Sequence, residues 1–110
     1  MSNQSWSVKI EERDGGLVFT VDAFGYSPGQ PLQAQKGDTV CWNNLTNATH
    51  QPNLSDTSGN PQPNGQLSDP IPGGASSTPA YVIQQVAPQT LYYVSFEAPK
   101  AGLGQISVVL

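Results

Sequence analysis

The stretch that decides the fold is KGDTVCWNN, residues 36–44. It begins with the turn-forming residues 36–38 and continues as a strand over residues 39–43. Val40 and Trp42 fall on one face of that strand, because successive side chains of a strand point to opposite sides. The pattern predicts a tight turn followed by a strand whose core face carries Val40 and Trp42.

The same two-residue alternation occurs on both sides of this stretch. Residues 6–10 alternate apolar and polar side chains, and residues 17–22 repeat the pattern after a turn at residues 13–16. Further segments are short, extended and rich in β-branched or aromatic residues: 31–34, 81–85, 91–96 and 105–110. No segment shows a helical period. We therefore predict an all-β fold, a Greek-key β-sandwich of seven to eight strands.

Length and composition indicate one domain over residues 1–110. The chain holds 11 glycines and 10 prolines, which is typical of a turn-rich β protein. Proline, glycine, serine and asparagine gather in residues 51–80, where apolar periodicity is weak. We expect this region to be a long loop with at most one short strand.

Charge and hydropathy exclude several classes of function. The formal net charge is −4, and the four basic residues are scattered along the chain, so no patch for phosphates forms and nucleic-acid binding is not expected. No apolar run is long enough to span a membrane. The first ten residues lack the layout of a secretion signal, so either the protein stays where it is made or a signal has been removed.

Residues 24–50 resemble the first half of a plastocyanin- or azurin-like cupredoxin. The matching features are Phe24, Pro28, the 36–44 stretch and a short loop that ends at His50. Later segments resemble the family's Pro-Gly turn and its last two strands: residues 71–74, 92–93 and 104–108. The resemblance implies the cupredoxin fold, with His50 in the place of a copper-binding histidine. It also implies a periplasmic or secreted protein.

The remaining ligands of a type 1 copper site are missing. Such a site needs a thiolate and two imidazoles, usually with a weak axial thioether. An ungapped alignment on the last two strands places Val94 at the cysteine position, Glu97 at the histidine position and Gly102 at the methionine position. No Cys, His or Met follows His50 in the sequence. The chain therefore resembles a cupredoxin that has lost its type 1 copper ligands.

Cys41 is the only cysteine and does not supply the missing thiolate. It precedes His50 by nine residues and lies on the strand face opposite Trp42. A structural, inert cysteine is the better interpretation. We predict that Val94 packs inside the sandwich and fills space that a ligand sulfur occupies in copper-binding relatives.

Two functions remain open. The first is a non-redox binding or structural module for a protein or glycan, with no cofactor and no enzymatic activity. The alternative is a copper-binding or electron-transfer protein with an altered, non-blue site, in which His50 and Glu97 bind copper weakly. If the first holds, we expect the working surface at the sandwich end formed by residues 44–50, 51–80 and 97–103, since loops at sandwich ends usually carry recognition.

Overall fold

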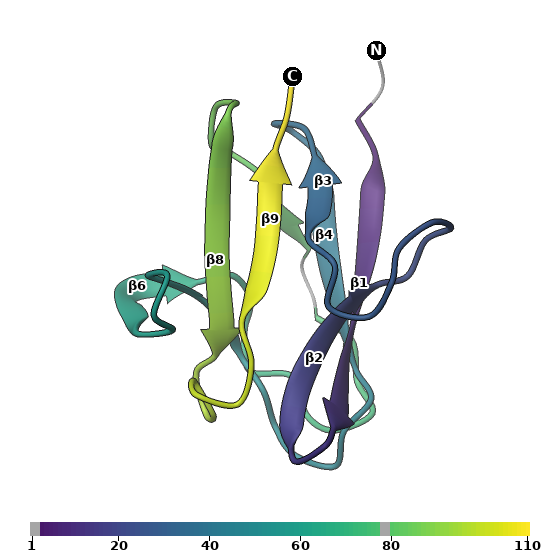
Figure 1. Cartoon of the computed structure of the whole chain (residues 1–110), viewed down its shortest axis with the longest axis vertical. Coiled ribbons are helices and arrows are strands. Elements are labelled where there is room, and N and C mark those ends of the chain that lie inside the picture. Colours follow the sequence, from purple (N-terminus) through teal and green to yellow (C-terminus); the bar gives the residue numbers. More distant parts are fainter. Residues whose placement is uncertain (1–2, 78–79) are drawn as a thin grey trace.

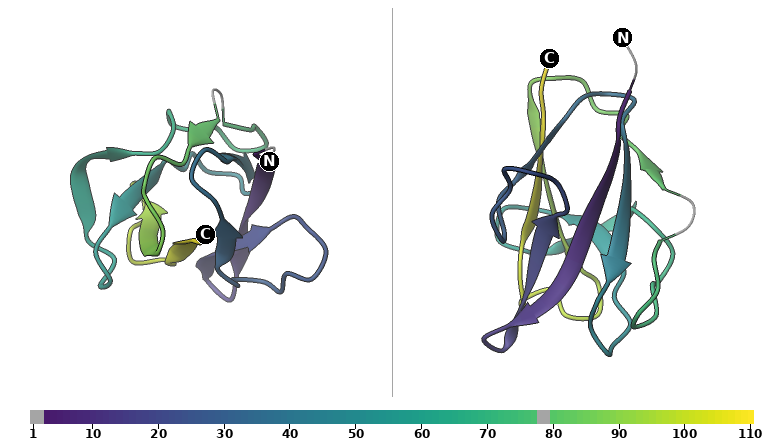
Figure 2. Two further views of the ribbon diagram at one scale, coloured as in Figure 1. Left: turned by 90° about the horizontal axis from the view of Figure 1, so that it is seen from above. Right: turned by 90° about the vertical axis from the view of Figure 1, so that its right-hand side faces the viewer.

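The computed structural model describes residues 3–77 and 80–110. Two mixed sheets face each other (Figures 1 and 2), and the described part contains nine strands and no helix. Their order is β2-β1-β4-β7 in one sheet and β3-β9-β8-β5-β6 in the other. The strands are β1 (Ser5–Arg13), β2 (Gly16–Val21), β3 (Leu32–Ala34), β4 (Thr39–Asn44), β5 (Pro52–Ser55), β6 (Pro61–Gln66), β7 (Tyr81–Val82), β8 (Gln89–Ser95) and β9 (Gly104–Val108).

The predicted sandwich is confirmed, and the alternating residues lie where the pattern placed them. β1 pairs with β2 in an antiparallel hairpin and with β4 in parallel, which brings Trp6 opposite Val40 and Val8 opposite Trp42. Val8, Val40 and Trp42 are all buried. The apolar face of the four-stranded sheet thus turns toward the second sheet, as a sandwich requires.

Three aromatic rings join the two sheets. Trp42 of β4 and Tyr93 of β8 meet edge to face with ring centroids 5.4 Å apart, and Phe19 of β2 lies 4.8 Å from the same tyrosine ring. Burial raises the pKa of Tyr93, so its phenol is neutral in the core. Such aromatic pairs stabilise the packing of the two sheets beyond the hydrophobic contribution of the buried area.

The expected loop over residues 51–80 needs a correction, because it contains two strands, β5 and β6. β5 pairs with β8 on one side and with β6 on the other, so backbone hydrogen bonds bring it into the sheet despite its weak apolar pattern. β6 lies at the sheet edge and contains Pro61 and Pro63. Proline is tolerated there because one side of an edge strand needs no donor.

Figure 1 shows both termini at one end of the molecule and the β1–β2 turn at the other. The chain leaves β4 and β8 at that second end, so three turns gather there: residues 13–16, 45–51 and 96–103. We call this group of turns the His50 end. The long segment of residues 22–31 between β2 and β3 projects from the side of the sandwich (Figures 1 and 2).

Asp38 holds the turn before β4 through three donors. Its carboxylate accepts the backbone N–H groups of Gln4 and Gln35 and the indole N–H of Trp6 at 2.9–3.0 Å. Burial by itself raises the pKa of Asp38. The hydrogen bonds from Gln35, Gln4 and Trp6 together outweigh burial, and the net pKa lies below its ordinary value.

We expect Asp38→Asn to lower the free energy of unfolding by about 1–3 kcal/mol at pH 7, because an amide oxygen cannot replace a carboxylate that accepts three bonds. A folded-state pKa below the unfolded one stabilises the protein above the ordinary value of about 3.9, and this contribution is lost as the pH falls. Urea unfolding at pH 7 and near pH 3 should therefore show that the wild type and Asp38→Asn differ less in their free energy of unfolding at the lower pH. An equal difference at both pH values, or an equal loss in the exposed control Asp69→Asn, contradicts this account.

Candidate functional site

His50 is buried at the His50 end and its ring is engaged by a serine. Its exposed fraction is 5%, and its backbone bridges to Ile71 through two hydrogen bonds. The ring Nδ1 lies 2.6 Å from the hydroxyl oxygen of Ser95, the last residue of β8. Ser95 is fully buried. Sequence reasoning did not identify this serine as a neighbour of His50.

Glu97 completes a short chain of polar groups. Its Oε1 accepts the backbone N–H of Gln51 at 2.7 Å and the Ser95 hydroxyl at 3.3 Å. The structure therefore brings together two of the predicted site residues, His50 and Glu97, with Ser95 between them. Glu97 itself is exposed, so the chain runs from the buried imidazole to the solvent.

Val94 is fully buried but does not face His50. Its neighbours Tyr93 and Ser95 point into the sandwich, and successive side chains of a strand point to opposite faces. Val94 is accordingly absent from the main core cluster and lies beside Gly59 on the outer face of β8. The side chain is buried, as predicted, but the prediction that it packs inside the sandwich in the space of a ligand sulfur is wrong, because Ser95 lies against His50 and Val94 lies on the other face of β8. The alternation of Leu91, Tyr93 and Ser95 along the sequence was the signal that could have identified Ser95, rather than Val94, as the residue beside His50.

Gly102 lies against the backbone of β2. A Cβ atom at this position would come within 2.0 Å of the Leu17 carbonyl oxygen. That contact leaves no space for any side chain, including the thioether of an axial methionine. The close approach is maintained by the backbone hydrogen bond from the Leu17 N–H to the Ala101 carbonyl oxygen at 2.8 Å.

Cys41 lies on β4 away from this group. Its thiol donates to the Ser77 carbonyl oxygen at 3.2 Å and accepts the Ser77 hydroxyl at 3.4 Å. Trp42, the next residue, points into the core. The structure thus agrees with the interpretation of Cys41 as a residue of the outer strand face.

Asn44 shapes the loop that carries His50. Its side-chain amide donates to the carbonyl oxygens of Ala48 and Ile71, and its Oδ1 accepts the N–H and the hydroxyl of Thr46. Because the residue is fully buried, these bonds satisfy polar groups that water cannot reach. They hold residues 45–50 in one conformation and position His50 opposite Ser95.

Beside His50 is a cavity of about 210 Å³ that is open to solvent. Its walls come mainly from small residues of the surrounding turns, including Gly16, Ala48, Ala98 and Ala101, with Glu12 at one side. Exposed apolar side chains stand on the same turns: Leu45 at 58%, Phe96 at 54% and Leu103 at 37%. The His50 end therefore carries a small pocket and, on the same turns, three exposed apolar side chains that do not line it.

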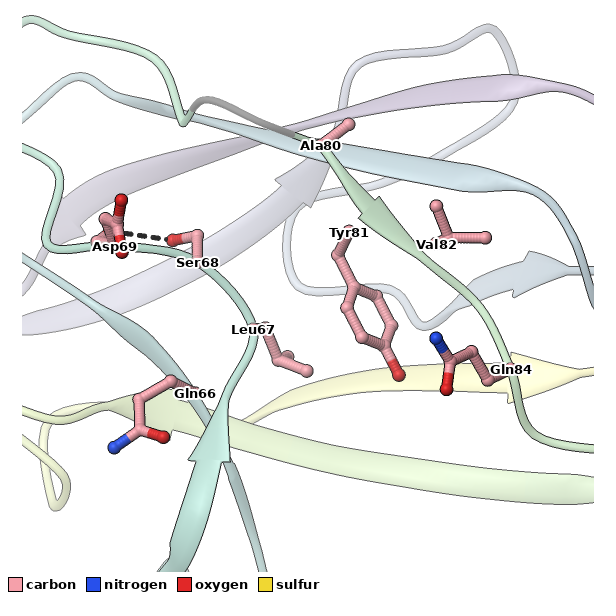
Figure 3. Close-up of a pocket in the computed structure, with 8 residues that line it drawn as sticks. All are labelled: Gln66, Leu67, Ser68, Asp69, Ala80, Tyr81, Val82 and Gln84. Carbon is pink, nitrogen blue, oxygen red and sulfur yellow. Dashed lines mark hydrogen bonds between the residues drawn. The ribbon is translucent and has the colours of Figure 1, made fainter.

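Another cavity, of about 330 Å³, opens between the edges of the two sheets, where residues 66–69 face residues 80–84. Figure 3 shows the ring of Tyr81 beside Leu67, with the amides of Gln66 and Gln84 around them. Tyr81 donates its hydroxyl to Gln85. Among the described residues that line it, the titratable side chains are those of Asp69 and Tyr81.

Solved structures reveal what this sandwich resembles. A purple cupredoxin from Nitrosopumilus maritimus matches over 92% of this chain and 98% of its own, with a TM-score of 0.62 and 18% identity. The chain has a cupredoxin-like fold. No family model and no curated protein matches it, so the likeness rests on architecture.

Domains of larger cupredoxin-fold proteins match as well. The multicopper oxidase McoA from Aquifex aeolicus matches over 97% of this chain with a TM-score of 0.59 and 15% identity. The blue copper oxidase from Nitrosomonas europaea matches over 98% of this chain with a TM-score of 0.55 and 14% identity. This chain spans 27% and 39% of those oxidases, respectively. At such identities the matches establish the fold alone.

The cupredoxin-like fold implies copper, but the side chains here do not fit a blue-copper centre. The group at His50 offers one imidazole, one hydroxyl and one carboxylate, whereas that centre needs a thiolate and a second imidazole. Within residues 3–77 and 80–110, no three His, Cys, Asp or Glu side chains come together as a metal site. In the same part of the chain, no helix is long and apolar enough to cross a membrane.

Proposed function

We propose that this cupredoxin-like chain is a non-redox binding module without a blue copper site, and that it recognises a protein through the His50 end. The observation that carries the proposal is the hydrogen bond between His50 and Ser95. It engages the imidazole nitrogen inside the protein, where cupredoxins with a blue site use histidine to bind the metal.

The surface of the His50 end supports a role in protein recognition. Leu45, Phe96 and Leu103 are large apolar side chains exposed on two neighbouring turns. Aromatic residues such as phenylalanine are enriched at protein interfaces, where a few anchors carry most of the binding energy. The internal bonds of Asn44 make one of these turns rigid, which lowers the entropy lost on binding.

An enzymatic role finds no support at the same place. Ser95, His50 and Glu97 are the residue types of a hydrolytic triad, but the serine hydroxyl lies between the other two groups and is fully buried. A nucleophile must reach its substrate. The proposal includes a periplasmic or secreted location, which is supported by the family resemblance alone.

The alternative function is a weak non-blue copper site at His50 and Glu97. It is favoured because only one side chain, that of Ser95, lies between these two residues. It requires the His50–Ser95 bond to break before Nδ1 binds a metal. Isothermal titration with Cu(II) on the wild type and on Glu97→Gln tests it. A stoichiometric site in the wild type that weakens tenfold or more in Glu97→Gln supports the alternative over the binding module.

The proposed interface predicts which surface changes weaken partner capture. The wild-type protein is immobilised and the captured protein is identified from its native cells; Phe96→Ser and Leu103→Ser are then compared with Lys9→Glu on the face of β1. We expect each apolar change to weaken binding by about tenfold or more, corresponding to about 1.4 kcal/mol, with Lys9→Glu unchanged. Circular dichroism verifies folding. Capture that survives both apolar changes and is lost in Lys9→Glu disproves the interface.

A further inference from the structure

A cavity of about 360 Å³ lies on the side of the sandwich where the 22–31 segment meets β1 and β3. It has no residue in common with the His50 end. Residues from four separate parts of the chain line it: Gln4 and Trp6, then Tyr26, then Gln33, Ala34, Gln35 and Asp38, and finally Val109. Its volume is at the lower end of the roughly 300–1,000 Å³ typical of small-molecule sites.

The two aromatic rings of this cavity are held in place by their polar atoms. The indole N–H of Trp6 donates to Asp38 at 3.0 Å, and the hydroxyl of Tyr26 accepts the Gln33 backbone N–H at 3.1 Å. The ring centroids are 6.2 Å apart with an interplanar angle of 76°. Both residues are half-buried, so the rings are fixed while part of each surface stays accessible.

Among the described residues that line the cavity, the one charged group is the Asp38 carboxylate. Three N–H donors already occupy the Asp38 carboxylate, so it has little capacity left for a cation. The side-chain amides of Gln4 and Gln33 are exposed and make no hydrogen bond within the described part of the chain. An amide offers both donors and an acceptor, which matches a hydroxyl group on a ligand.

We propose that this cavity binds a neutral carbohydrate. The two rings are nearly perpendicular, so the apolar C–H face of a pyranose would pack on the accessible face of one ring with the other ring at its edge. Its hydroxyls would exchange hydrogen bonds with the amides of Gln4 and Gln33. No lysine or arginine lines the cavity to favour a phosphate or carboxylate ligand. The amides, in turn, disfavour a purely apolar ligand, which would leave them without partners.

The 22–31 segment carries a third aromatic ring. Phe24 is completely exposed, at 105% of the reference area, and stands two residues before Tyr26. A large apolar side chain with this exposure does not pack against the described part of the chain. Phe24 does not line the cavity, so a ligand would touch this ring only if it extended beyond the cavity along the segment.

Tryptophan fluorescence tests the proposal, because Trp6 is half-buried whereas the other tryptophan, Trp42, is fully buried. Cellohexaose, laminarihexaose, chitohexaose and maltohexaose are each titrated to about 5 mM, which detects dissociation constants in the millimolar range. We expect at least one to give a saturable change in emission. Its dissociation constant should rise tenfold or more in Tyr26→Ala and severalfold in Gln33→Ala.

Phe96→Ser at the His50 end is the matched control and should bind the saccharide like the wild type. Because Gln33 is exposed, Gln33→Ala tests the site even if Tyr26→Ala fails to fold. Absence of saturation with all four saccharides, or unchanged affinity in Gln33→Ala, overturns the proposal. These outcomes leave the His50 end untested, so failure here is distinguishable from failure of the proposed protein interface.

Discussion

With Cu(II), the wild-type protein should show no intense visible absorption, whereas the variant Ser95→Cys/Glu97→His should develop a strong band. The colour of a blue site comes from a thiolate bound to copper beside two imidazoles. A cysteine at position 95 would place its sulfur where the serine oxygen now contacts His50 Nδ1 at 2.6 Å. A histidine at position 97 would replace a carboxylate that lies 3.3 Å from the same oxygen.

A matched control follows from the alternation along β8. Val94→Cys/Glu97→His carries the same ligands at the positions of the ungapped alignment, but its cysteine would lie on the outer face, away from His50. We expect that variant to remain without the band. Both variants are made in a Cys41→Ala background, so that no second thiol contributes. A band in the wild type that disappears in Cys41→Ala, or one in the Val94 variant alone, contradicts the assignment.

Gly102→Ala should destabilise the fold by about 3 kcal/mol, which lowers the melting temperature by roughly 10–20 °C. The added Cβ would meet the Leu17 carbonyl oxygen at 2.0 Å and its carbon at 2.9 Å. Both are backbone atoms of β2, which pairs with β1 along its whole length, so they cannot move aside like the end of a flexible side chain.

Gly25→Ala is the control for this prediction. Gly25 has a φ of 91° but nothing lies within 4 Å of its added Cβ, so only backbone strain of about 1 kcal/mol is expected. Thermal unfolding followed by circular dichroism compares the two. Equal destabilisation in both variants would mean that the contact with Leu17 is relieved at little cost.

The sequence was most informative where the pattern is local. Alternation in residues 6–10, 17–22 and 39–43 predicted strands that the structure contains, because the two-residue period of a strand is visible without knowing its partners. β5 and β6 were missed for the opposite reason. They are held in the sheet by backbone hydrogen bonds to β8 and to each other, which leave little trace in residue type.

At the site, sequence reasoning selected His50 and Glu97, and the structure brings them together through Ser95. It assigned Val94 to the cysteine position because an ungapped alignment counts residues and ignores which face of a strand they occupy. The alternation along β8 determines that facing, because Tyr93 and Ser95 point into the sandwich and Val94 between them points to the outer face.

By itself, the sequence determined the class of fold and the absence of a second histidine and of a thiolate near His50, since these follow from local periodicity and residue identity. Only the tertiary structure decided that Ser95 engages His50, that Gly102 has no space for a side chain, and that Trp6, Tyr26 and Gln33 share a cavity. Each depends on contacts between residues far apart in the chain, and these distances are set by how the two sheets pack.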